Sequence, residues 1–512
     1  MPVVRFVLAD APTLGLDFPC PPEPLAHLPL ERDWKDQQRL WGHAYHPMCS
    51  YFGSFPATLA HAAIARWSRP GDVVLDLFSG RGTVPLQACA ERRIGVGLDL
   101  NPLAALLTGA KVDPPTLLEA EARLAHLRID WSLTSIDWLG LARAAMTQPD
   151  QALVPAPSGA SHRLEPLTEG VAFAFHPRTL AQLLFLRTAF RLDARADRFL
   201  AGATVGILHG RSASYLSTAM PNTFSLPPEY ARRYLESSGH QPPDRDVFTL
   251  LSQKLRRLYR DGRPATRGIA IEGDAREAGP LIQAALRSRG LPDRARLVVA
   301  SPPYLGLIRY GAANWLRLWF LGEDATDIDR RLATPHQPEA YGRFIGQVLE
   351  SLREVLAEDA VVALVIGDVA TDRGRRARPS QPLAETAWSL GAEPAGYRLA
   401  GISADPIRAD RKATRLWGEE AGRATDTDRL LVIAPTEVGR RRALAAVGTP
   451  IDWSGGKRFE RPSILPPYAP DVSPGRPRID GSTRPDEEPR PRADDQSQTE
   501  LRPAAAGALV PA

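Results

Sequence analysis

The stretch DVVLDLFSGRGT, residues 72–83, decides the class of fold. It opens with an apolar run bounded by aspartates, which predicts a short buried strand, and Gly80 and Gly82 follow at once. Glycine has no Cβ, so the backbone can turn tightly there and come close to a ligand. From Thr83 to about Arg92 the sequence predicts a helix. Strand, glycine turn and helix in this order indicate the first unit of a parallel α/β sheet.

The same alternation recurs along the chain. Residues 94–100, IGVGLDL, predict a second strand, and residues 102–111 predict a second helix. Short apolar runs that alternate with helices are typical of a sheet covered on both faces. We therefore predict an α/β protein with a doubly wound, mostly parallel, Rossmann-like sheet. Its further strands are expected at residues 268–272, 296–300, 360–366 and 429–434.

The composition indicates a protein of the cell interior. Of 512 residues 44% are hydrophobic, which is enough for a large core, and the formal net charge is +4. This balance permits a polyanionic partner without requiring one, because counterion release depends on local clusters of charge. Three cysteines are too few for a disulfide framework, and no apolar run approaches the length of a membrane span. We expect a cytoplasmic protein with free thiols and no membrane contact.

The alternation of strands and helices breaks at one long stretch. Residues 116–266 show mostly helical periodicity, and Asp246 is placed to cap one of the helices. From about Gly455 the chain turns to Pro, Arg, Asp and Ser with few apolar residues, which predicts disorder. The expected segments are an N-terminal extension (1–44), a first part of the sheet domain (45–115), a helical insertion that is a candidate substrate-binding subdomain (116–266), a second part of the sheet domain (267–440) and a disordered tail (455–512).

Two acidic residues at predicted strand ends indicate a ligand site. Open parallel sheets bind ligands beyond the carboxyl ends of their strands, and here the first two strands end at Asp76 and Asp99. A carboxylate in the second position accepts hydrogen bonds from a ribose diol, which implies an adenosine cofactor. A nicotinamide fingerprint would have a third glycine where this chain has Pro85, and Asp76 suits a cationic ligand better than a pyrophosphate. A sulfonium that carries an α-amino group is such a ligand.

At these residues the chain resembles the nucleic-acid amino-methyltransferases. Residues 76–83 and 97–102 look like the cofactor motifs of that family, and residues 51–56, YFGSFP, look like its segment that packs on the methionine end. Residues 273–275 resemble the acidic position that meets the adenine amino group. The resemblance implies S-adenosyl-L-methionine as cofactor and a methyltransferase sheet with a large helical insertion. The cofactor-binding residues that it implies are Phe55, Pro56, Asp76, Phe78, Ser79, Gly80, Gly82, Thr83, Asp99, Asn101, Pro102, Asp274 and Ala275.

A second motif, ASPPY at residues 300–304, closes the predicted strand 296–300. An exocyclic amine on an aromatic base is a poor nucleophile, because its lone pair is delocalised into the ring. Acceptors that hold the two amine protons favour a tetrahedral nitrogen, whose lone pair then points at the methyl group. The candidate acceptors are the Ser301 hydroxyl and the Pro302 carbonyl, which the prolines hold rigidly. The predicted catalytic residues are Ser301, Pro302, Pro303 and Tyr304, with the Tyr304 ring as a stacking surface for the base and no covalent intermediate.

The resemblance, which covers about residues 45–435, also sets the expected substrate. Residues 412–418 and 424–432 look like the C-terminal part of bacterial DNA modification methylases. The form of the motif with serine first is similar to enzymes that act on cytosine N4, so that atom is favoured over adenine N6. A base in duplex DNA must first be flipped out, which costs a few kcal/mol. One departure is that the helical insertion precedes residues 273–275, so the resemblance does not equate it with a target-recognition domain.

Other functions stay open at this point. They are an RNA base amino-methyltransferase, a catalytically silent nucleic-acid-binding protein of the same fold, and a protein methylase acting on glutamine amides. DNA is the expected partner ahead of RNA, and a cognate restriction nuclease is a further candidate partner. The sequence does not predict the oligomeric state.

Two basic runs are candidate phosphate contacts, with an ordinary solvated loop as the alternative for each. One run follows the predicted strand 360–366, on the rim that carries the active site, and the other lies further along the chain. The residues of the first run are Arg373, Arg375, Arg376 and Arg378, and those of the second are Arg408, Arg411, Lys412 and Arg415.

Three further features have weaker claims to function. Cys20, in FPCPP, looks like the nucleophile of cytosine C5 enzymes but precedes the cofactor loop, so we expect no catalytic role for it. His43, His46 and Cys49 have the spacing of metal ligands without an evident fourth ligand, so no metal is expected. The serine-rich loop 209–222 either lines the base pocket or caps the helical insertion.

Overall fold

The computed structural model of the chain describes most of the residues before position 455. The chain divides into two compact units after Phe459, and every described residue belongs to the first unit. The described residues are 25–37, 41–51, 53–149, 151–157, 164–168, 170–210, 212–218, 228–239, 241–303, 309–332, 335, 337–368, 383–406 and 427–454.

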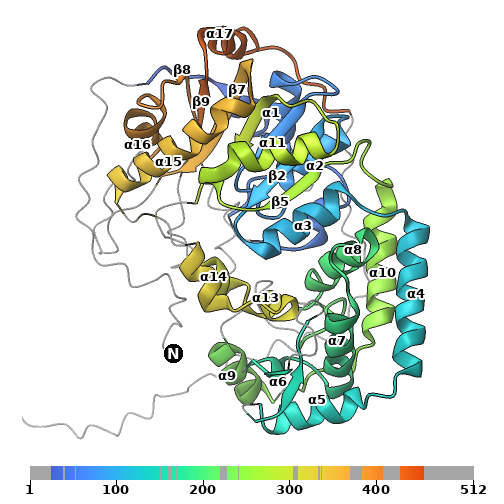
Figure 1. Cartoon of the computed structure of the whole chain (residues 1–512). Helices are drawn as coiled ribbons and strands as arrows, with labels where there is room; N and C mark the ends of the chain where they lie inside the picture. Colours follow the sequence, from blue (N-terminus) through green and yellow to red (C-terminus); the bar gives the residue numbers. More distant parts are fainter. Residues whose placement is uncertain are drawn as a thin grey trace, which may run out of the picture. The chain divides into compact units, whose positions relative to one another are not determined.

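Seven strands form one sheet in the order β5-β2-β1-β6-β7-β9-β8 (Figure 1). The first five strands of this order are parallel to one another, whereas β9 runs antiparallel to β7 and to β8. The chain moves outward from β1 through β2 to β5 and then returns to the other side of β1 with β6. The strand order therefore reverses between β1 and β6, where doubly wound sheets bind their ligands. The strands are β1 (Val73–Asp76), β2 (Ile94–Asp99), β5 (Ile269–Glu272), β6 (Ala295–Ala300), β7 (Leu356–Gly367), β8 (Arg398–Pro406) and β9 (Thr427–Ala434).

Alternate side chains of the strands enter two different apolar cores, one on each face of the sheet. Val73 and Leu75 of β1 pack in the core that contains α11, α15 and α16, and Val74 packs in the core that contains α1, α2 and α17. Both faces are therefore covered, as a doubly wound sheet requires. The helices of the sheet domain are α1 (Ala57–Trp67), α2 (Thr83–Ala90), α3 (Pro102–Val112), α11 (Ala278–Ser288), α15 (Pro338–Leu352), α16 (Leu383–Ala387) continued by the π-helical η6 (Trp388–Ala392), and α17 (Glu437–Ala445).

The chain covers the β8 edge of the sheet with its own N-terminal segment. Ile402 of β8 donates its backbone N–H to the carbonyl of Ala26 at 2.8 Å, and Leu28 donates its N–H to the carbonyl of Ile402 at 2.7 Å. Residues 26–28 thus lie parallel to β8 like a short extra strand. Around Ile402 the edge therefore offers no free backbone groups to another chain.

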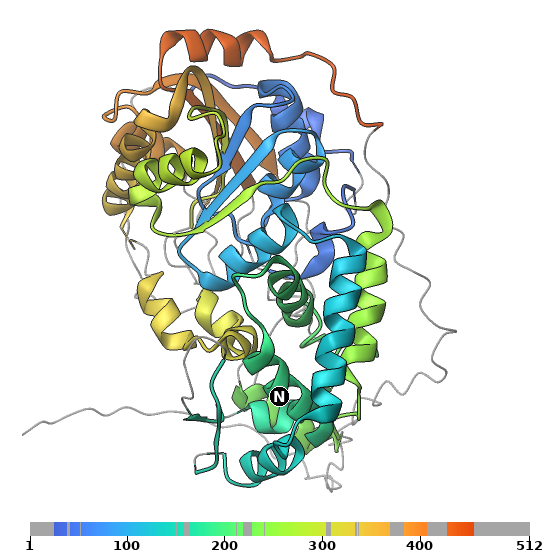
Figure 2. The same cartoon turned by 45° about the vertical axis from the view of Figure 1, so that its right-hand side comes forward.

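A second body is built from helices, and two separate stretches of chain supply it. We call it the helical body; it consists of residues 117–258 and of residues 310–331, which follow the ASPPY motif. Figures 1 and 2 both show α4 and α10 running side by side. The helices of the body are α4 (Leu117–Leu133), α5 (Trp138–Thr147), α6 (Val171–Ala174), α7 (Pro177–Ala189), α8 (Arg195–Val205), α9 (Pro228–Ser238), α10 (Val247–Leu258), α12 (Tyr310–Ala313), α13 (Trp315–Leu321) and α14 (Ala325–Arg331), with an antiparallel pair β3 (Leu153–Pro155) and β4 (Leu164–Pro166). The 3-10 turns are η1 (Leu30–Asp33), η2 (His46–Met48), η3 (Tyr259–Asp261), η4 (Ala275–Glu277) and η5 (Arg353–Val355).

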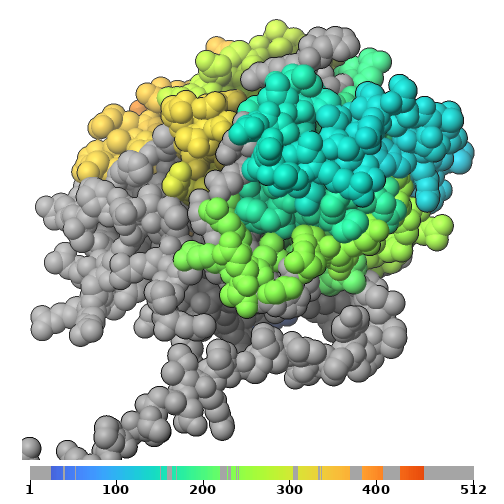
Figure 3. All heavy atoms as spheres, turned by 90° about the horizontal axis from the view of Figure 1, so that it is seen from below, coloured from blue at the N-terminus to red at the C-terminus, as the bar shows by residue number. Residues whose placement is uncertain are grey.

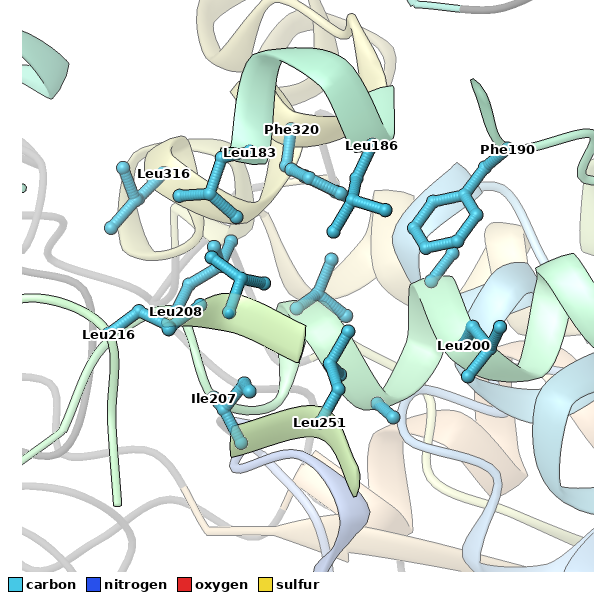
Figure 4. Close-up of a cluster of buried hydrophobic side chains, with 14 of the residues drawn as sticks. Leu183, Leu186, Phe190, Leu200, Ile207, Leu208, Leu216, Leu251, Leu316 and Phe320 are labelled. Atoms are coloured by element: carbon cyan, nitrogen blue, oxygen red, sulfur yellow. The ribbon is translucent and has the colours of Figure 1, made fainter. Parts of the chain in front are cut away.

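One apolar core joins the helical body to the sheet domain. Leu103 and Leu107 of α3 are fully buried in the same cluster as the inner side chains of the helical body. The two stretches of the body share this core, and α13 packs against α7. Figure 4 shows Leu316 and Phe320 of α13 beside Leu183 and Leu186 of α7, with Leu200 of α8 and Leu251 of α10 in the same cluster.

Helix α4 lies on the outside of the helical body. Its inner stripe, which includes Leu124 and Leu127, is buried, whereas Leu118 and Leu133 on its other side are 76% and 77% exposed. Figure 3 shows the outer surface of α4 and α5 in cyan and teal. Only one stripe of α4 is therefore used to hold the body together.

The predicted fold class is confirmed, and the strands predicted within residues 72–100, 268–300 and 360–434 are present. The side chain of Asp246 accepts a hydrogen bond from the N–H of Thr249 and caps α10, as predicted. Strand β8 and the antiparallel direction of β9 were not predicted from the sequence. Among the described residues, no helix combines the length and apolar character needed to cross a membrane.

Candidate active site

The carboxyl ends of three neighbouring strands carry the residues that the sequence analysis singled out. Asp76 is the last residue of β1, Asp99 is the last residue of β2, and Ser301 directly follows β6. These strands are parallel, so the three residues leave the sheet at the same edge. Leu75 of β1 lies opposite Val298 of β6, which brings the glycine turn and the serine-proline motif next to each other. The two motifs flank the point at which the strand order reverses.

The loop between β1 and α2 has a shape that strongly favours glycine. Gly80 and Gly82 have φ angles of +49° and +73°, in the left-handed region. A Cβ on Gly82 would lie 2.8 Å from the hydroxyl oxygen of Thr108 in α3, so that position has no room for a side chain. The hydroxyl oxygens of Ser79 and Thr108 are 3.0 Å apart and share a hydrogen bond. This hydrogen bond holds the loop against α3.

Lys111, one turn further along α3, holds the same loop. Its side chain is fully buried, and its ammonium donates a hydrogen bond to the backbone carbonyl of Arg81 at 2.5 Å. Burial keeps the pKa of this ammonium well below its usual range. The sequence analysis did not identify Lys111, because a lysine in a helix that follows a strand is usually a surface residue.

The Asp99 carboxylate is already oriented by the backbone. One oxygen accepts the N–H of Gly80 at 2.8 Å, and the other accepts the N–H of Asn101 at 2.9 Å. A carboxylate oxygen can accept more than one hydrogen bond, so the group can hold a ribose diol in addition. Burial raises the pKa of Asp99 to about 6, although the two backbone donors lower it and the nearby Glu272 charge raises it further.

Asp76 is more deeply buried than Asp99. Its carboxylate accepts the N–H of Phe78 at 3.2 Å. Burial raises its pKa to about 8, against the effect of that hydrogen bond, and the neighbouring Asp99 charge raises it as well. A cationic ligand bound beside these two acidic groups would favour the ionised form of both.

Tyr51 completes the surroundings of Asp99, and it was not among the predicted residues. Its hydroxyl accepts a hydrogen bond from the side-chain amide of Asn101 at 2.9 Å. The Asn101 side chain in turn accepts the N–H of Leu103 and caps α3, which begins at Pro102. Burial raises the pKa of Tyr51 well above its usual range.

The remaining residues with a predicted cofactor role lie in different environments. Phe55 precedes α1 and packs partly buried against the core that α1 covers, and Pro56 is the exposed cap of that helix. Phe78 packs against Phe344 with ring centroids 6.0 Å apart. Thr83 is the buried first residue of α2.

Asp274 follows β5, and its carboxylate is engaged within its own turn. It caps η4 by accepting the N–H of Arg276, and it forms an ion pair with the Arg276 guanidinium at 2.5 Å. The arginine side chain holds the pKa of Asp274 below its usual value. An adenine amino group would therefore share this carboxylate with Arg276. Ala275 is buried beside it.

Ser301 has a defined hydrogen-bonding role. Its hydroxyl is 3.0 Å from the backbone carbonyl oxygen of Val365 in β7. A carbonyl can only accept, so the Ser301 hydroxyl is the donor in this hydrogen bond, and a hydroxyl oxygen that donates can still accept. Pro302 next to it is buried, and Pro303 is half-buried.

Several predictions lie outside the described residues. These are the Tyr304 stacking role, the roles of both basic runs (Arg373, Arg375, Arg376 and Arg378; Arg408, Arg411, Lys412 and Arg415), the place of Cys20, the tail 455–512 and the end of the serine-rich loop. The described part of that loop folds back on the two residues Ile207 and Leu208, which follow α8: Leu216 donates its N–H to the carbonyl of Ile207, and Ser217 donates its N–H to the carbonyl of Leu208.

His46 and Cys49 have protein partners. His46 Nε2 is 2.8 Å from the side-chain oxygen of Gln87, and the Cys49 thiol donates to the carbonyl of Ser50. Within the described part of the chain, no group of three or more His, Cys, Asp or Glu side chains is arranged to hold a metal ion.

An open groove of about 660 Å³ lies at the opposite, amino-terminal edge of the strands. Asp72 and Arg296 line it and form an ion pair at 3.6 Å. It is remote from the strand ends that carry Asp76, Asp99 and Ser301, because the two edges are the two ends of the same parallel strands.

Comparison with known proteins connects the first part of the chain to DNA methylases. Residues 28–106 match the family model described as DNA methylase. A type II methyltransferase of Citrobacter freundii, M.Cfr9I, is 36% identical over 70 residues, which cover 14% of this chain and 23% of that protein. M.XycI of Xanthomonas campestris pv. cyanopsidis is 38% identical over 69 residues, or 13% of this chain and 23% of that protein. The resemblance to DNA amino-methyltransferases is thus confirmed over this part, although the chain spans under a quarter of each relative.

Solved structures give a weaker likeness. TrmN from Thermus thermophilus has 12% sequence identity and a TM-score of 0.25, over 76% of this chain and 52% of that one. The rRNA methyltransferase aviRa from Streptomyces viridochromogenes has 13% identity and a TM-score of 0.26, over 78% of this chain and 90% of that one. Scores this low carry no argument about function. The family match ends in α3, so the serine-proline motif lies beyond it.

Proposed function

We propose that this chain, whose residues 28–106 match the DNA methylases, transfers a methyl group from S-adenosylmethionine to an exocyclic amino group of a base in DNA. The observation that carries the proposal is the shared edge of β1, β2 and β6, at which an oriented carboxylate, a glycine turn and an acceptor serine lie on neighbouring strands.

The residues of the glycine turn fit the cofactor. When bound, S-adenosylmethionine supplies a methyl group on a sulfonium, which a nucleophile can attack directly. Gly80 and Gly82 let the backbone come close to the ligand, and Asp99 keeps lone pairs for the ribose diol. Burial raises the pKa of Asp76 to about 8, and a bound ligand with two cationic groups would lower that pKa and favour the negatively charged carboxylate. Water is kept from this charge because Asp76 is 3% exposed.

Ser301 supplies what an amine nucleophile needs. The Val365 carbonyl takes the hydroxyl proton, so the Ser301 oxygen faces the amine as an acceptor. An acceptor that binds an amine proton withdraws the nitrogen from conjugation with the ring and directs its lone pair away from the acceptor. The carbonyl of Pro302 is the proposed second acceptor. These atoms would accept hydrogen bonds from the amine without being alkylated, so the transfer would take one step. The N–C bond would form as the S–C bond breaks, and the methylated nitrogen would release its extra proton to water.

The substrate is proposed to be cytosine N4, ahead of adenine N6, in a base that has left the duplex. The support for cytosine N4 is the serine at the first position of the motif. Flipping the base costs a few kcal/mol, and stacking on Tyr304 would offset roughly 1–3 kcal/mol of this. A cognate restriction nuclease is the proposed functional partner of such an enzyme.

The decisive experiment is mass spectrometry of nucleosides after incubation with the purified chain and methyl-labelled S-adenosylmethionine. Genomic DNA that lacks methylation and total RNA serve as parallel substrates. We expect labelled N4-methylcytosine from DNA alone. Label at adenine N6 would change the target atom, and label confined to RNA would overturn the assignment to DNA.

Two variants separate catalysis from folding in this assay. Tyr304→Ala is expected to lose most of its turnover while calorimetry shows that cofactor binding survives. Tyr259→Phe is the control, because this tyrosine lies in η3, directly after the helical body, and its hydroxyl donates to the Pro115 carbonyl. We expect turnover of the control within about twofold of the unmodified chain. Loss of cofactor binding in Tyr304→Ala would contradict the proposed role in stacking the base.

A further inference from the structure

The chain after the serine-proline motif returns to the cofactor edge instead of continuing the sheet. Residues 309–332, here called the α12–α14 segment, belong to the helical body. At its end, the guanidinium of Arg331 donates to the carbonyl of Leu100 at 3.4 Å and to the carboxylate of Glu272 at 3.2 Å. Leu100 follows Asp99, and Glu272 lies opposite Asp99 in the β2–β5 pair. The segment therefore lies across the two strand ends at which an adenosine would bind.

At its beginning, the α12–α14 segment places an aromatic ring on Tyr51. The rings of Tyr310 and Tyr51 are stacked, with centroids 6.0 Å apart and planes at 22°. Tyr51 is fixed by Asn101, and a Cβ on Gly80 would lie 3.5 Å from its ring. Gly80 and Asn101 are the two residues that orient Asp99. The pair of rings thus adjoins the diol-binding carboxylate.

The charge of Asp99 raises the pKa of both tyrosines, Tyr310 and Tyr51. Burial raises the pKa of Tyr310 above its usual value, and the Asp99 charge raises it further. The Asp99 charge has the same effect on the pKa of Tyr51, after that of burial. Electrostatic coupling of this kind requires that the two hydroxyl groups lie near the carboxylate.

Tyr310 cannot move freely, because α12 is tied to α14. The carboxylate of Asp329 accepts the N–H of Gly311 at 2.7 Å, the N–H of Ala312 at 3.1 Å and the Nε–H of Arg309 at 3.3 Å. A Cβ on Gly311 would collide with the carbonyl of Ala325, so the close approach of the two helices depends on this glycine. The position of the ring is therefore set by the packing of the helices.

We propose that Tyr310, with Tyr51 behind it, forms the wall of the cofactor site against which the ribose of an adenosine ligand packs. This inference rests on the proposed function and adds a cofactor-binding element that comes from the helical body. A diol bound to Asp99 has its oxygens about 3 Å from the carboxylate and therefore lies beside these rings. The Tyr310 ring gives the apolar side of the sugar a surface that excludes water. The cofactor thereby contacts the stretch of chain that continues directly from Ser301.

The test uses the full chain and S-adenosylhomocysteine as the probe, with Kd measured by calorimetry. Tyr310→Ala is expected to raise Kd about tenfold, near the lower end of what a stacked ring contributes. Tyr310→Phe keeps the ring and is expected to stay within about twofold of the unmodified chain. Tyr259→Ala is the matched control, because Tyr259 is also a partly buried ring packed against the core of the helical body.

A second measurement uses the unmodified chain, so its result does not depend on whether a variant folds. Hydrogen exchange of the unmodified chain, followed by mass spectrometry, is expected to show slower exchange in residues 309–321 when the probe is added. If the unmodified chain binds the probe, but Tyr310→Ala binds equally well or exchange in this region is unchanged, the Tyr310 contact is refuted. If the unmodified chain does not bind the probe at all, the cofactor assignment itself is wrong.

Discussion

Removal of the Asp99 carboxylate tests the placement of the ribose. In Asp99→Ala we expect the backbone N–H groups of Gly80 and Asn101 to keep their positions. The glycine turn is still held by the Ser79–Thr108 hydrogen bond and by Lys111, and Asn101 still caps α3. A ribose diol would lose two hydrogen bonds to an ionised group, each worth about 1.5 kcal/mol. The sum of about 3 kcal/mol corresponds to a Kd about a hundredfold higher.

The assay is calorimetry of S-adenosylhomocysteine binding at pH 8, where a carboxylate with a pKa of about 6 is ionised. Thermal unfolding is recorded in parallel, because two backbone N–H groups lose their acceptor and the variant is expected to be less stable. Asp72→Ala is the matched control. Asp72 stands at the other end of β1, where it accepts the N–H of Arg69 at 2.8 Å and pairs with Arg296.

The control is expected to bind within about twofold of the unmodified chain. A folded Asp99→Ala protein that binds as tightly as the control would refute the reasoning. In that case the ribose would not lie at the end of β2, and the contact with Tyr310 would lose its basis as well.

Three further predictions address the acidic pair, the acceptor serine and the loop. Because the pKa of Asp76 in the folded chain is about 8, above its ordinary value, the folded state holds a proton that the unfolded state has lost between about pH 4 and 8. Stability should therefore fall as pH rises through that window, and Asp76→Asn should abolish this part of the fall in thermal unfolding temperature, while cofactor binding weakens. Ser301→Ala removes the acceptor that Val365 orients. We expect kcat to fall about a hundredfold, while the Kd for the cofactor stays within about twofold of that of the unmodified chain. An unchanged kcat would exclude Ser301 from the chemistry. Gly82→Ala places a Cβ on a residue with a left-handed φ and too close to Thr108. We expect the free energy of unfolding, measured by denaturant titration, to fall by about 2 kcal/mol or more. An unchanged free energy of unfolding would contradict this explanation.

The sequence by itself determined the strands, turns and acidic positions of the cofactor edge. In residues 72–83 a buried strand and two glycines are local features, since the apolar run must be buried and the left-handed angles of Gly80 and Gly82 admit hardly any other residue. Asp99 is likewise the last residue of a short apolar strand, so its place at the strand end also follows from the local sequence. The acceptor role of Ser301 could be proposed from the motif, but the direction of its proton depends on the carbonyl of Val365 in another strand.

Tertiary structure alone decided which distant residues complete the site. Tyr310 and Lys111 stand in no local pattern that marks them, yet Tyr310 stacks on Tyr51 and Lys111 is buried under the glycine turn. Tyr51 stands in the YFGSFP segment, but that pattern does not predict its contacts with Tyr310 and Asn101. The same holds for the antiparallel β9 and for the N-terminal segment at the β8 edge. The physical reason is that local sequence fixes backbone conformation and the need for burial, whereas the partner that a side chain meets depends on how helices from separate stretches share one core.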